Sequence, residues 1–531
     1  MFKKKNKSVS ALIATILLIV VAVALIAIIL TWGKSFTTKS ISEVSTFKDA
    51  SDTYLIKPVK LVNGSLIFKN ISTVNDDINI IGYKIIASDP DTNGDIQYLD
   101  TPIILSQGSQ DGIRITTPTD KTFTVQLYTS DGKYIDIKNV TNSGATSVAS
   151  FAKVFGGTGE DMGYSVQQTS DGGYIATGQI SNGNNDDVYL VKLNASGNLD
   201  WNKSFDLIEG YSEYGYSVQQ TTDGGYIISG NAYSTDYGVY NIFLLKTTSL
   251  GIEDWHYLYD VSGDGYESYG YSVQQTNDNG YIVTGYTSNG SNSDVFLLKT
   301  DSSGSQEWNY LFDVASEYFD QGCSVQQTDD NGYIITGYTS DPDTGYSNIF
   351  LLKTDSSGSQ EWTQIFDIGN YDYAYSVQQT TDEGYIVGGY DVNDDTGYND
   401  GYLLKTDDTG TEEWSKNINV DGESDYYISA LDQTSDGGYI LAGERASDYG
   451  YIYLLKVDST GNVDWNKSIG TPTNEDYATS VQQTTDGGYV LTGFTSAYSA
   501  NECDSSQMFI IKTNSSGVVN LSGLPIYPNG C

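Results

Sequence analysis

One stretch of the sequence places oxygen-bearing side chains at the spacing of a calcium-binding loop. It covers residues 89–100 and reads DPDTNGDIQYLD. Oxygen ligands fall at positions 1, 3, 5 and 12 of such a loop, and the glycine at position 6 permits its sharp turn. The residues concerned are Asp89, Asp91, Asn93, Asp95 and Asp100. We expect them to bind Ca²⁺; the alternative is an acidic surface turn.

Tyrosines and acidic residues alternate in four further segments, at residues 209–214, 264–269, 316–320 and 370–373. Tyrosine rings stack on apolar surfaces, and carboxylates accept hydrogen bonds from hydroxyl groups or bind Ca²⁺. These segments therefore predict a binding surface for a surface glycan or a protein. Its tyrosines are Tyr211, Tyr214, Tyr266, Tyr269, Tyr318, Tyr371 and Tyr373. For each residue singly, the alternative is that the ring only packs against its neighbours.

The chain offers little for acid–base or nucleophilic catalysis. His256 is the single histidine, and it stands beside Trp255 in a segment that looks like a strand. A Ser-His-Asp triad and a multi-histidine metal site are therefore excluded. Paired carboxylates could hydrolyse glycosides, but 68 acidic residues give no basis for choosing a pair. We expect a non-enzymatic protein without catalytic residues, and keep a cell-surface hydrolase as an alternative.

The chain has three cysteines, too few for a disulfide scaffold. We expect Cys323 to be a buried free thiol, and Cys503 and Cys531 to pair if the compartment is oxidising. Asn-X-Ser/Thr sequons permit N-glycosylation outside the cell. They lie at Asn63, Asn70, Asn139, Asn194, Asn202, Asn289, Asn466, Asn514 and Asn520.

The net charge is −41, with a pI of about 4.1. Such a surface repels DNA, RNA and anionic lipid and attracts divalent cations. Nucleic acid is therefore excluded as a partner. Beyond that, the acidity keeps the protein soluble.

Residues 9–33 form an uncharged apolar run that follows four lysines within the first seven residues. Twenty-five helical residues span about 37 Å, enough to cross a hydrocarbon core of about 30 Å. The lysines predict that the N-terminus stays in the cytoplasm and that the rest of the chain lies outside. The run is too long for a signal peptide and lacks a small-residue cleavage site.

Residues 7–19, KSVSALIATILLI, resemble the N-terminal segment of archaeal type IV pilins. The usual proline and the early glutamate of that family are absent here. The resemblance implies that a basic leader is cleaved near Lys7 to Val9, and that the helix then packs with copies of itself into a filament. The membrane would hold the chain before assembly. We therefore expect a pilus subunit at the cell surface; the alternative is a membrane-tethered binding protein that does not polymerise.

Residues 34–148 contain about six short segments of alternating polarity separated by Gly- and Asp-rich turns. Short strands at this spacing predict a small β-sandwich. This segment is similar to the β domain that follows the helix in archaeal pilins.

From about residue 151 one unit recurs seven times, every 50–55 residues. Each unit carries a Ser-Val-Gln-Gln-Thr anchor or its variant at 429–434, then Gly-Tyr-Ile/Val, then an apolar run ending in lysine. Six units end on a tryptophan, which we expect to be a core plug between repeats. The period and four strands per unit predict a seven-bladed β-propeller, similar to extracellular propeller repeats of bacteria and archaea.

The seventh unit has no tryptophan-containing strand after Lys512. A matching segment, residues 151–155, stands ahead of the first unit and carries no tryptophan. We expect the N-terminal strand to close the ring, with Phe151 in the place of the tryptophan. The chain would then reach the propeller on the face with short, uniform turns, and the face with variable loops would point outward. The expected organisation is a leader (1–8), a helix (9–33), a β-sandwich (34–148), a propeller (149–514) and a tail (515–531).

Overall fold

The computed structural model describes residues 150–519 except 158, 236–237, 264, 289, 316–318, 341–344, 393–396, 447–449, 471–474 and 497–505. Before residue 150 it describes the backbone of seven strands. The predicted leader, the apolar helix, residues 89–95 and the end of the tail lie outside the described residues. Within the described part of the chain, no helix is long and apolar enough to cross a membrane.

Chain contacts divide the protein into two units, Met1–Val148 and Ala149–Cys531. In the first unit the described strands form one three-stranded and one four-stranded antiparallel sheet. The sheets contain β1 (Leu61–Val62), β2 (Ser65–Lys69) and β5 (Gln110–Arg114), and β4 (Gln97–Leu105), β3 (Ile78–Ala87), β6 (Lys121–Thr129) and β7 (Tyr134–Asn142). The strand content agrees with a β domain, and the β-sandwich stays a prediction.

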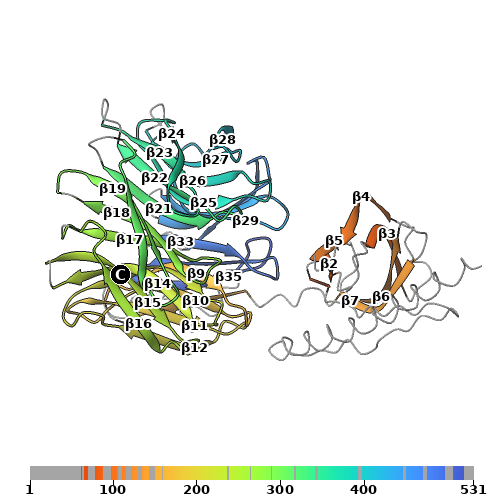
Figure 1. Cartoon of the computed structure of the whole chain (residues 1–531). Helices are drawn as coiled ribbons and strands as arrows, with labels where there is room; N and C mark the ends of the chain where they lie inside the picture. The colour runs from red at the N-terminus through yellow and green to blue at the C-terminus, as the bar shows by residue number, and fades with distance from the viewer. Residues whose placement is uncertain are drawn as a thin grey trace, which may run out of the picture. The chain divides into compact units, whose positions relative to one another are not determined.

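The second unit is a propeller of seven four-stranded antiparallel blades (Figure 1). Within each blade we name the strands A to D from the innermost outward. Blades 1 to 3 contain β9 (Met162–Gln168), β10 (Tyr174–Ser181), β11 (Asp186–Leu193) and β12 (Leu199–Phe205); β13 (Glu213–Gln220), β14 (Tyr226–Ser234), β15 (Val239–Thr247) and β16 (Glu253–Tyr259); and β17 (Ser268–Gln275), β18 (Tyr281–Ser288), β19 (Ser293–Thr300) and β20 (Gln306–Phe312). The predicted seven-bladed fold is confirmed.

The remaining blades repeat the same order. Blades 4 to 6 contain β21 (Asp320–Gln327), β22 (Tyr333–Ser340), β23 (Ser347–Thr354) and β24 (Gln360–Phe366); β25 (Asp372–Gln379), β26 (Tyr385–Val392), β27 (Asn399–Thr406) and β28 (Glu412–Ile418); and β29 (Asp425–Gln433), β30 (Tyr439–Ala446), β31 (Gly450–Val457) and β32 (Val463–Ile469). Blade 7 contains β33 (Asp476–Gln483), β34 (Tyr489–Thr495), β35 (Gln507–Thr513) and β8 (Phe151–Phe155).

The ring closes with the strand that precedes the first repeat. Strand β8 pairs antiparallel with β35, so that Phe151 lies opposite Lys512. In blade 6 the pair Trp465 and Lys456 has the same register. Figure 1 shows the last strands, in blue, beside the first blade, in yellow. The predicted closure is confirmed, and it gives blade 7 its fourth strand.

The tryptophan of each strand D packs against the next blade. The Trp255 ring lies 5.9 Å from the Tyr281 ring of the following blade. A Cβ atom on Gly304, in the C–D turn of that blade, would come within 2.8 Å of the Trp255 ring. Phe151 packs in the same way against Gly197 and Tyr174. The tryptophans are therefore core plugs between blades, as predicted.

The first glutamine of each anchor joins neighbouring strands A around the ring. The side-chain Oε1 of Gln167 accepts a hydrogen bond from the backbone N–H of Gln220 in the next blade. In the same way, Gln219 Oε1 accepts one from the backbone N–H of Gln275. The ring continues through every junction, with Asp432 in one glutamine place, at distances of 2.5 to 2.7 Å. The anchor is thus explained by its repeated contacts between blades.

Buried lysines mark one face of the propeller. Each strand C ends in a lysine whose Nζ lies 2.8 to 3.1 Å from an aspartate of the A–B turn in its own blade. We call this face, with its A–B and C–D turns, the constant face, and the opposite face, with its B–C and D–A loops, the variable face. Lys512 pairs with Asp486 and lies opposite Phe151. The chain therefore enters the propeller at the constant face, as predicted.

Candidate functional site

Tyrosines gather where the innermost strands reach the variable face. They stand on strands A ahead of the Ser-Val-Gln-Gln anchor, and at corresponding levels of strands B. All are half-buried. We call this layer the tyrosine mouth. It comprises Tyr164, Tyr214, Tyr216, Tyr269, Tyr271, Tyr286, Tyr338, Tyr373, Tyr375, Tyr390, Tyr427 and Tyr477.

Rings of the tyrosine mouth contact one another across blade boundaries. Tyr164, Tyr216 and Tyr271 come from three successive strands A, with centroids 5.0 and 5.2 Å apart. Tyr269 lies 5.0 Å from Tyr286 in a nearly parallel orientation. Tyr390 lies 4.8 Å from Tyr427 of the next blade. The contacts form an aromatic wall around part of the channel.

Burial keeps the phenols of Tyr214, Tyr216 and Tyr390 protonated at neutral pH. Burial raises the pKa of Tyr214 and that of Tyr390 to about 12, and it also raises the pKa of Tyr216. Tyr164 donates a hydrogen bond to Gln179 Oε1 at 2.6 Å, and Tyr338 donates one to a glutamine side chain at 2.7 Å. The rings are thus held in place, and their hydroxyl groups act as neutral donors and acceptors.

Carboxylates lie beside these rings. Tyr214 donates a hydrogen bond to Asp186 Oδ2 at 3.3 Å. Glu444 lies opposite Tyr427 in the β29–β30 pair. Burial raises the pKa of Glu444 to about 7, and the nearby Glu475 and Asp425 carboxylates contribute to the increase. The mouth therefore combines flat aromatic surface with hydrogen-bond acceptors.

The predicted ligand-binding tyrosines fall into two groups. Tyr214, Tyr269 and Tyr373 belong to the tyrosine mouth. Tyr211, Tyr266 and Tyr371 lie farther along the loops and are 39 %, 41 % and 40 % exposed. Tyr318 lies outside the described residues. Tyr211 stacks on Tyr233 with a centroid distance of 4.3 Å, so its inner face is covered.

The sequence interpretation missed four tyrosines of the mouth that stand at one position of strands A. Tyr164, Tyr216, Tyr271 and Tyr375 directly precede the Ser-Val-Gln-Gln anchor. Their repetition at one register was a signal that could have identified them. Cys323, Ser429 and Thr479 stand at this register in the other blades.

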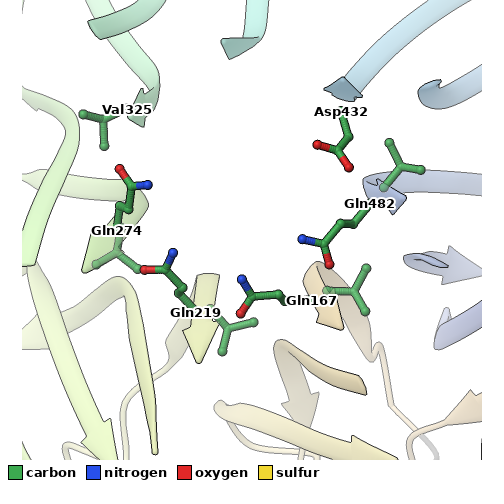
Figure 2. A pocket seen from close by; sticks show the side chains of 10 residues that line it. Gln167, Gln219, Gln274, Val325, Asp432 and Gln482 are labelled. Atoms are coloured by element: carbon green, nitrogen blue, oxygen red, sulfur yellow. The ribbon is translucent and has the colours of Figure 1, made fainter. Parts of the chain in front are cut away.

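A cavity of about 210 Å³ lies closer to the constant face, at the glutamine ring. Figure 2 shows the Gln167, Gln219 and Gln482 carboxamides and the Asp432 carboxyl around one opening, with valines behind them. Burial raises the pKa of Asp432 to about 6, although hydrogen bonds from Gln483, Gln378 and Gln433 favour its charged form. Sequence reasoning did not assign this polar layer a role; its signal was the irregular anchor at 429–434.

The remaining predicted sites have mixed outcomes. Asp100 lies in β4 and the rest of the predicted calcium loop, 89–95, is outside the described residues. Cys323 is a free thiol as predicted but half-buried rather than buried, and desolvation raises its pKa to about 12. Cys503 and Cys531 are outside the described residues. His256 lies on the outer strand β16, with its Nδ1 2.7 Å from Glu253 Oε1.

The described sequons lie on turns and outer strands. Asn194 lies in a C–D turn and Asn514 in the turn that follows β35, and each Oδ1 accepts hydrogen bonds from two backbone N–H groups. Asn202 and Asn466 lie on strands D, and Asn139 lies in β7. Glycosylation stays a prediction for all of these residues. Asn63, Asn70, Asn289 and Asn520 are outside the described residues.

No family model and no curated protein matches this chain. Among solved structures, the chain is similar to the periplasmic gluconolactonase PpgL of Pseudomonas aeruginosa, with 12% identity, a TM-score of 0.41, and coverage of 65% of this chain and 98% of that one. It is also similar to the Penicillium chrysogenum alpha-L-arabinanase complexed with arabinobiose, with 12% identity, a TM-score of 0.40, and coverage of 57% and 93%. Sqt1 of Chaetomium thermophilum, bound to the N-terminus of ribosomal protein L10, shares 12% identity, with a TM-score of 0.39 and coverage of 64% and 85%. Hydrolases and a binding protein thus occur together, and these similarities do not distinguish between the two functions.

Proposed function

We propose that this chain is a cell-surface binding protein whose propeller recognises a neutral carbohydrate at the tyrosine mouth. The observation that carries the proposal is the wall of half-buried tyrosines, such as Tyr216 and Tyr271, at the variable-face end of the channel. Aromatic faces stack on the C–H faces of sugars, and phenols and carboxylates bond to sugar hydroxyl groups. A net charge of −41 disfavours anionic polysaccharides.

Calorimetric titration of the full-length protein with a panel of neutral oligosaccharides tests this proposal. Tyr271→Ala is expected to weaken binding roughly tenfold, because it removes one stacking surface. The fold should tolerate the change, since Cys323 stands at the same register in blade 4. Tyr257→Ala, on outer strand β16 where Tyr257 is 48 % exposed, serves as the control and should bind normally. Unchanged binding by Tyr271→Ala, or no binding of any oligosaccharide, would contradict the proposal.

Glu444 favours a hydrolase as the second candidate function. A carboxyl with a pKa of about 7 beside a binding surface suits general acid catalysis. If the titrated oligosaccharide is cleaved, and Glu444→Gln abolishes cleavage without abolishing binding, the mouth is an active site. Binding without cleavage supports the first function.

The N-terminal segment supplies the second part of the proposal, and its support is the sequence alone. The lysines before residue 9 and the apolar run to residue 33 fit an anchor that becomes an assembly helix after cleavage. We expect electron microscopy with antibody against the propeller to label surface filaments, and the N-terminus of the mature subunit to start near Val9. Monomers with an intact Met1 would leave a tethered, unpolymerised binding protein.

A further inference from the structure

Three carboxylates that are not part of the tyrosine mouth converge between blades 1 and 2. Asp187 lies at the start of β11, Asp206 follows β12, and Glu213 begins β13. One oxygen from each lies within 4.8 Å of the others. Ligands on opposite sides of a Ca²⁺ ion, each about 2.4 Å away, are separated by about this distance. The three groups can therefore contact one ion.

Glu213 has an oxygen that no protein group satisfies. Its side chain is 0 % exposed, and Oε2 accepts the backbone N–H of Leu207 at 3.3 Å. Oε1 is buried and has no hydrogen-bond partner. Asp187 is 9 % exposed and accepts side-chain amides at 3.3 Å on Oδ1. A buried carboxylate oxygen without a donor is costly, so the arrangement calls for a cation or a proton.

Two sister blades supply a donor at the place where Glu213 has none, whereas Asp372 of blade 5 also has a buried Oδ1 without a partner. Asp320 begins strand A of blade 4, and the hydroxyl of Thr339, opposite it on strand B, donates to its carboxylate. Asp476 of blade 7 receives the same bond from Thr495. The residue opposite Glu213 is Ala232, whose methyl side chain offers no hydrogen-bond donor.

A second cluster shows which arrangement does not need an ion. Asp294, Asp313 and Asp320 also bring one oxygen each within 4.8 Å. There, however, Asp320 Oδ2 accepts the backbone N–H groups of Val314 and Ala315, and Oδ1 accepts the Thr339 hydroxyl. Both of its oxygens are thus satisfied, and we confine the inference to the first cluster.

We propose that Asp187, Asp206 and Glu213 bind a Ca²⁺ ion at the junction of blades 1 and 2. All three ligands are hard oxygen donors, which favours Ca²⁺ or Mg²⁺ over transition metals. The spread of the oxygens fits the longer metal–oxygen distances of Ca²⁺ better than those of Mg²⁺. Asp206 is exposed, so water reaches the ion and completes its coordination. The proposed ligands are not residues assigned to the carbohydrate site, although Glu213 directly precedes Tyr214 in the chain.

Calcium titration of the full-length protein, freed of metal with a chelator and kept in detergent, tests the site. Asp206→Asn should bind one Ca²⁺ fewer than the native protein, or bind that ion at least tenfold more weakly. Asp367→Asn is the matched control, because Asp367 is also exposed and follows strand D of blade 4 as Asp206 follows strand D of blade 1. Any ion at residues 89–100 contributes to all three proteins alike. Equal numbers and affinities in native protein and Asp206→Asn would overturn the proposal.

Thermal unfolding with Glu213→Gln separates an ion from a proton. Burial raises the pKa of Glu213 to about 8, and the Asp206 and Asp187 charges add to the effect, so a bound proton is the competing explanation. We expect Ca²⁺ to raise the unfolding midpoint of the native protein and to raise that of Glu213→Gln less. An equal calcium-dependent rise in both proteins, or none in the native protein, would show that no ion binds at Glu213.

Discussion

Asp432 is the one acid in a ring otherwise made of glutamines. The ring needs an oxygen that accepts the next blade's backbone N–H, and the Asp432 carboxylate accepts that of Gln483 at 2.7 Å. A neutral amide does the same without bringing a charge into the channel. Burial accordingly raises the pKa of Asp432 to about 6. A group whose pKa is raised on folding costs stability as the pH rises from its unfolded value, near 4, to its folded value.

Asp432→Asn should therefore stabilise the propeller at pH 8 and change little at pH 4. The expected gain in unfolding free energy at pH 8 is on the order of 1 to 2 kcal/mol, since channel water screens part of the pKa difference. Urea unfolding of the two proteins at pH 4 and pH 8 measures it, with Asp408→Asn on an exposed turn as the control. A variant that is less stable than the native protein at pH 8 would show that the charge itself is needed.

At this scale the sequence predicts residue types better than partners. Tyr214 and Tyr269 were identified because their loops alternate tyrosine with acid. Tyr216 was missed because it directly precedes the repeated anchor, where it reads as part of a strand. The need of Glu213 for a counter-ion depends on Ala232, which is set opposite it by strand register. Such a cross-strand pairing follows from the fold, and no local sequence pattern indicates it.

The A–B turns show how one backbone conformation recurs in all blades. The residue before the glycine of each Gly-Tyr-Ile/Val motif has a positive φ: Gly172 at 80°, Asn279 at 68° and Asn331 at 67°. Glycine and asparagine adopt this conformation readily. Glu383 takes the same position in blade 5 with φ at 71°. Glu383 therefore departs from the glycine or asparagine that the other blades have at this position.

Glu383→Gly should stabilise the propeller by about 1 kcal/mol, because glycine relieves the left-handed strain. Glu383→Ala keeps a Cβ atom and serves as the control, which should not gain this stability. Urea unfolding at pH 7 gives both differences, provided that the slope with denaturant is unchanged. If Glu383→Gly is less stable than the native protein, the greater freedom of the unfolded glycine outweighs the strain.

The whole propeller has two chemically different ends to its channel. Glutamines and Asp432 surround the channel near the constant face, where the chain enters at Phe151. Tyrosines and acids surround it at the variable face. The seven blades and their two faces could be predicted because the repeat fixes the strand order. The closing strand could be predicted because the seventh unit has no tryptophan-containing strand after Lys512. The course of the variable loops could not, because their lengths and sequences differ from blade to blade.

The most direct test of carbohydrate recognition is the structure of the full-length protein with the tightest-binding oligosaccharide of the neutral panel. We predict a sugar ring stacked on tyrosines of the mouth, among them Tyr216 or Tyr271, with its hydroxyl groups bonded to phenols or carboxylates there. A sugar bound only at the glutamine ring, the constant face or the outer strands would contradict the proposed function.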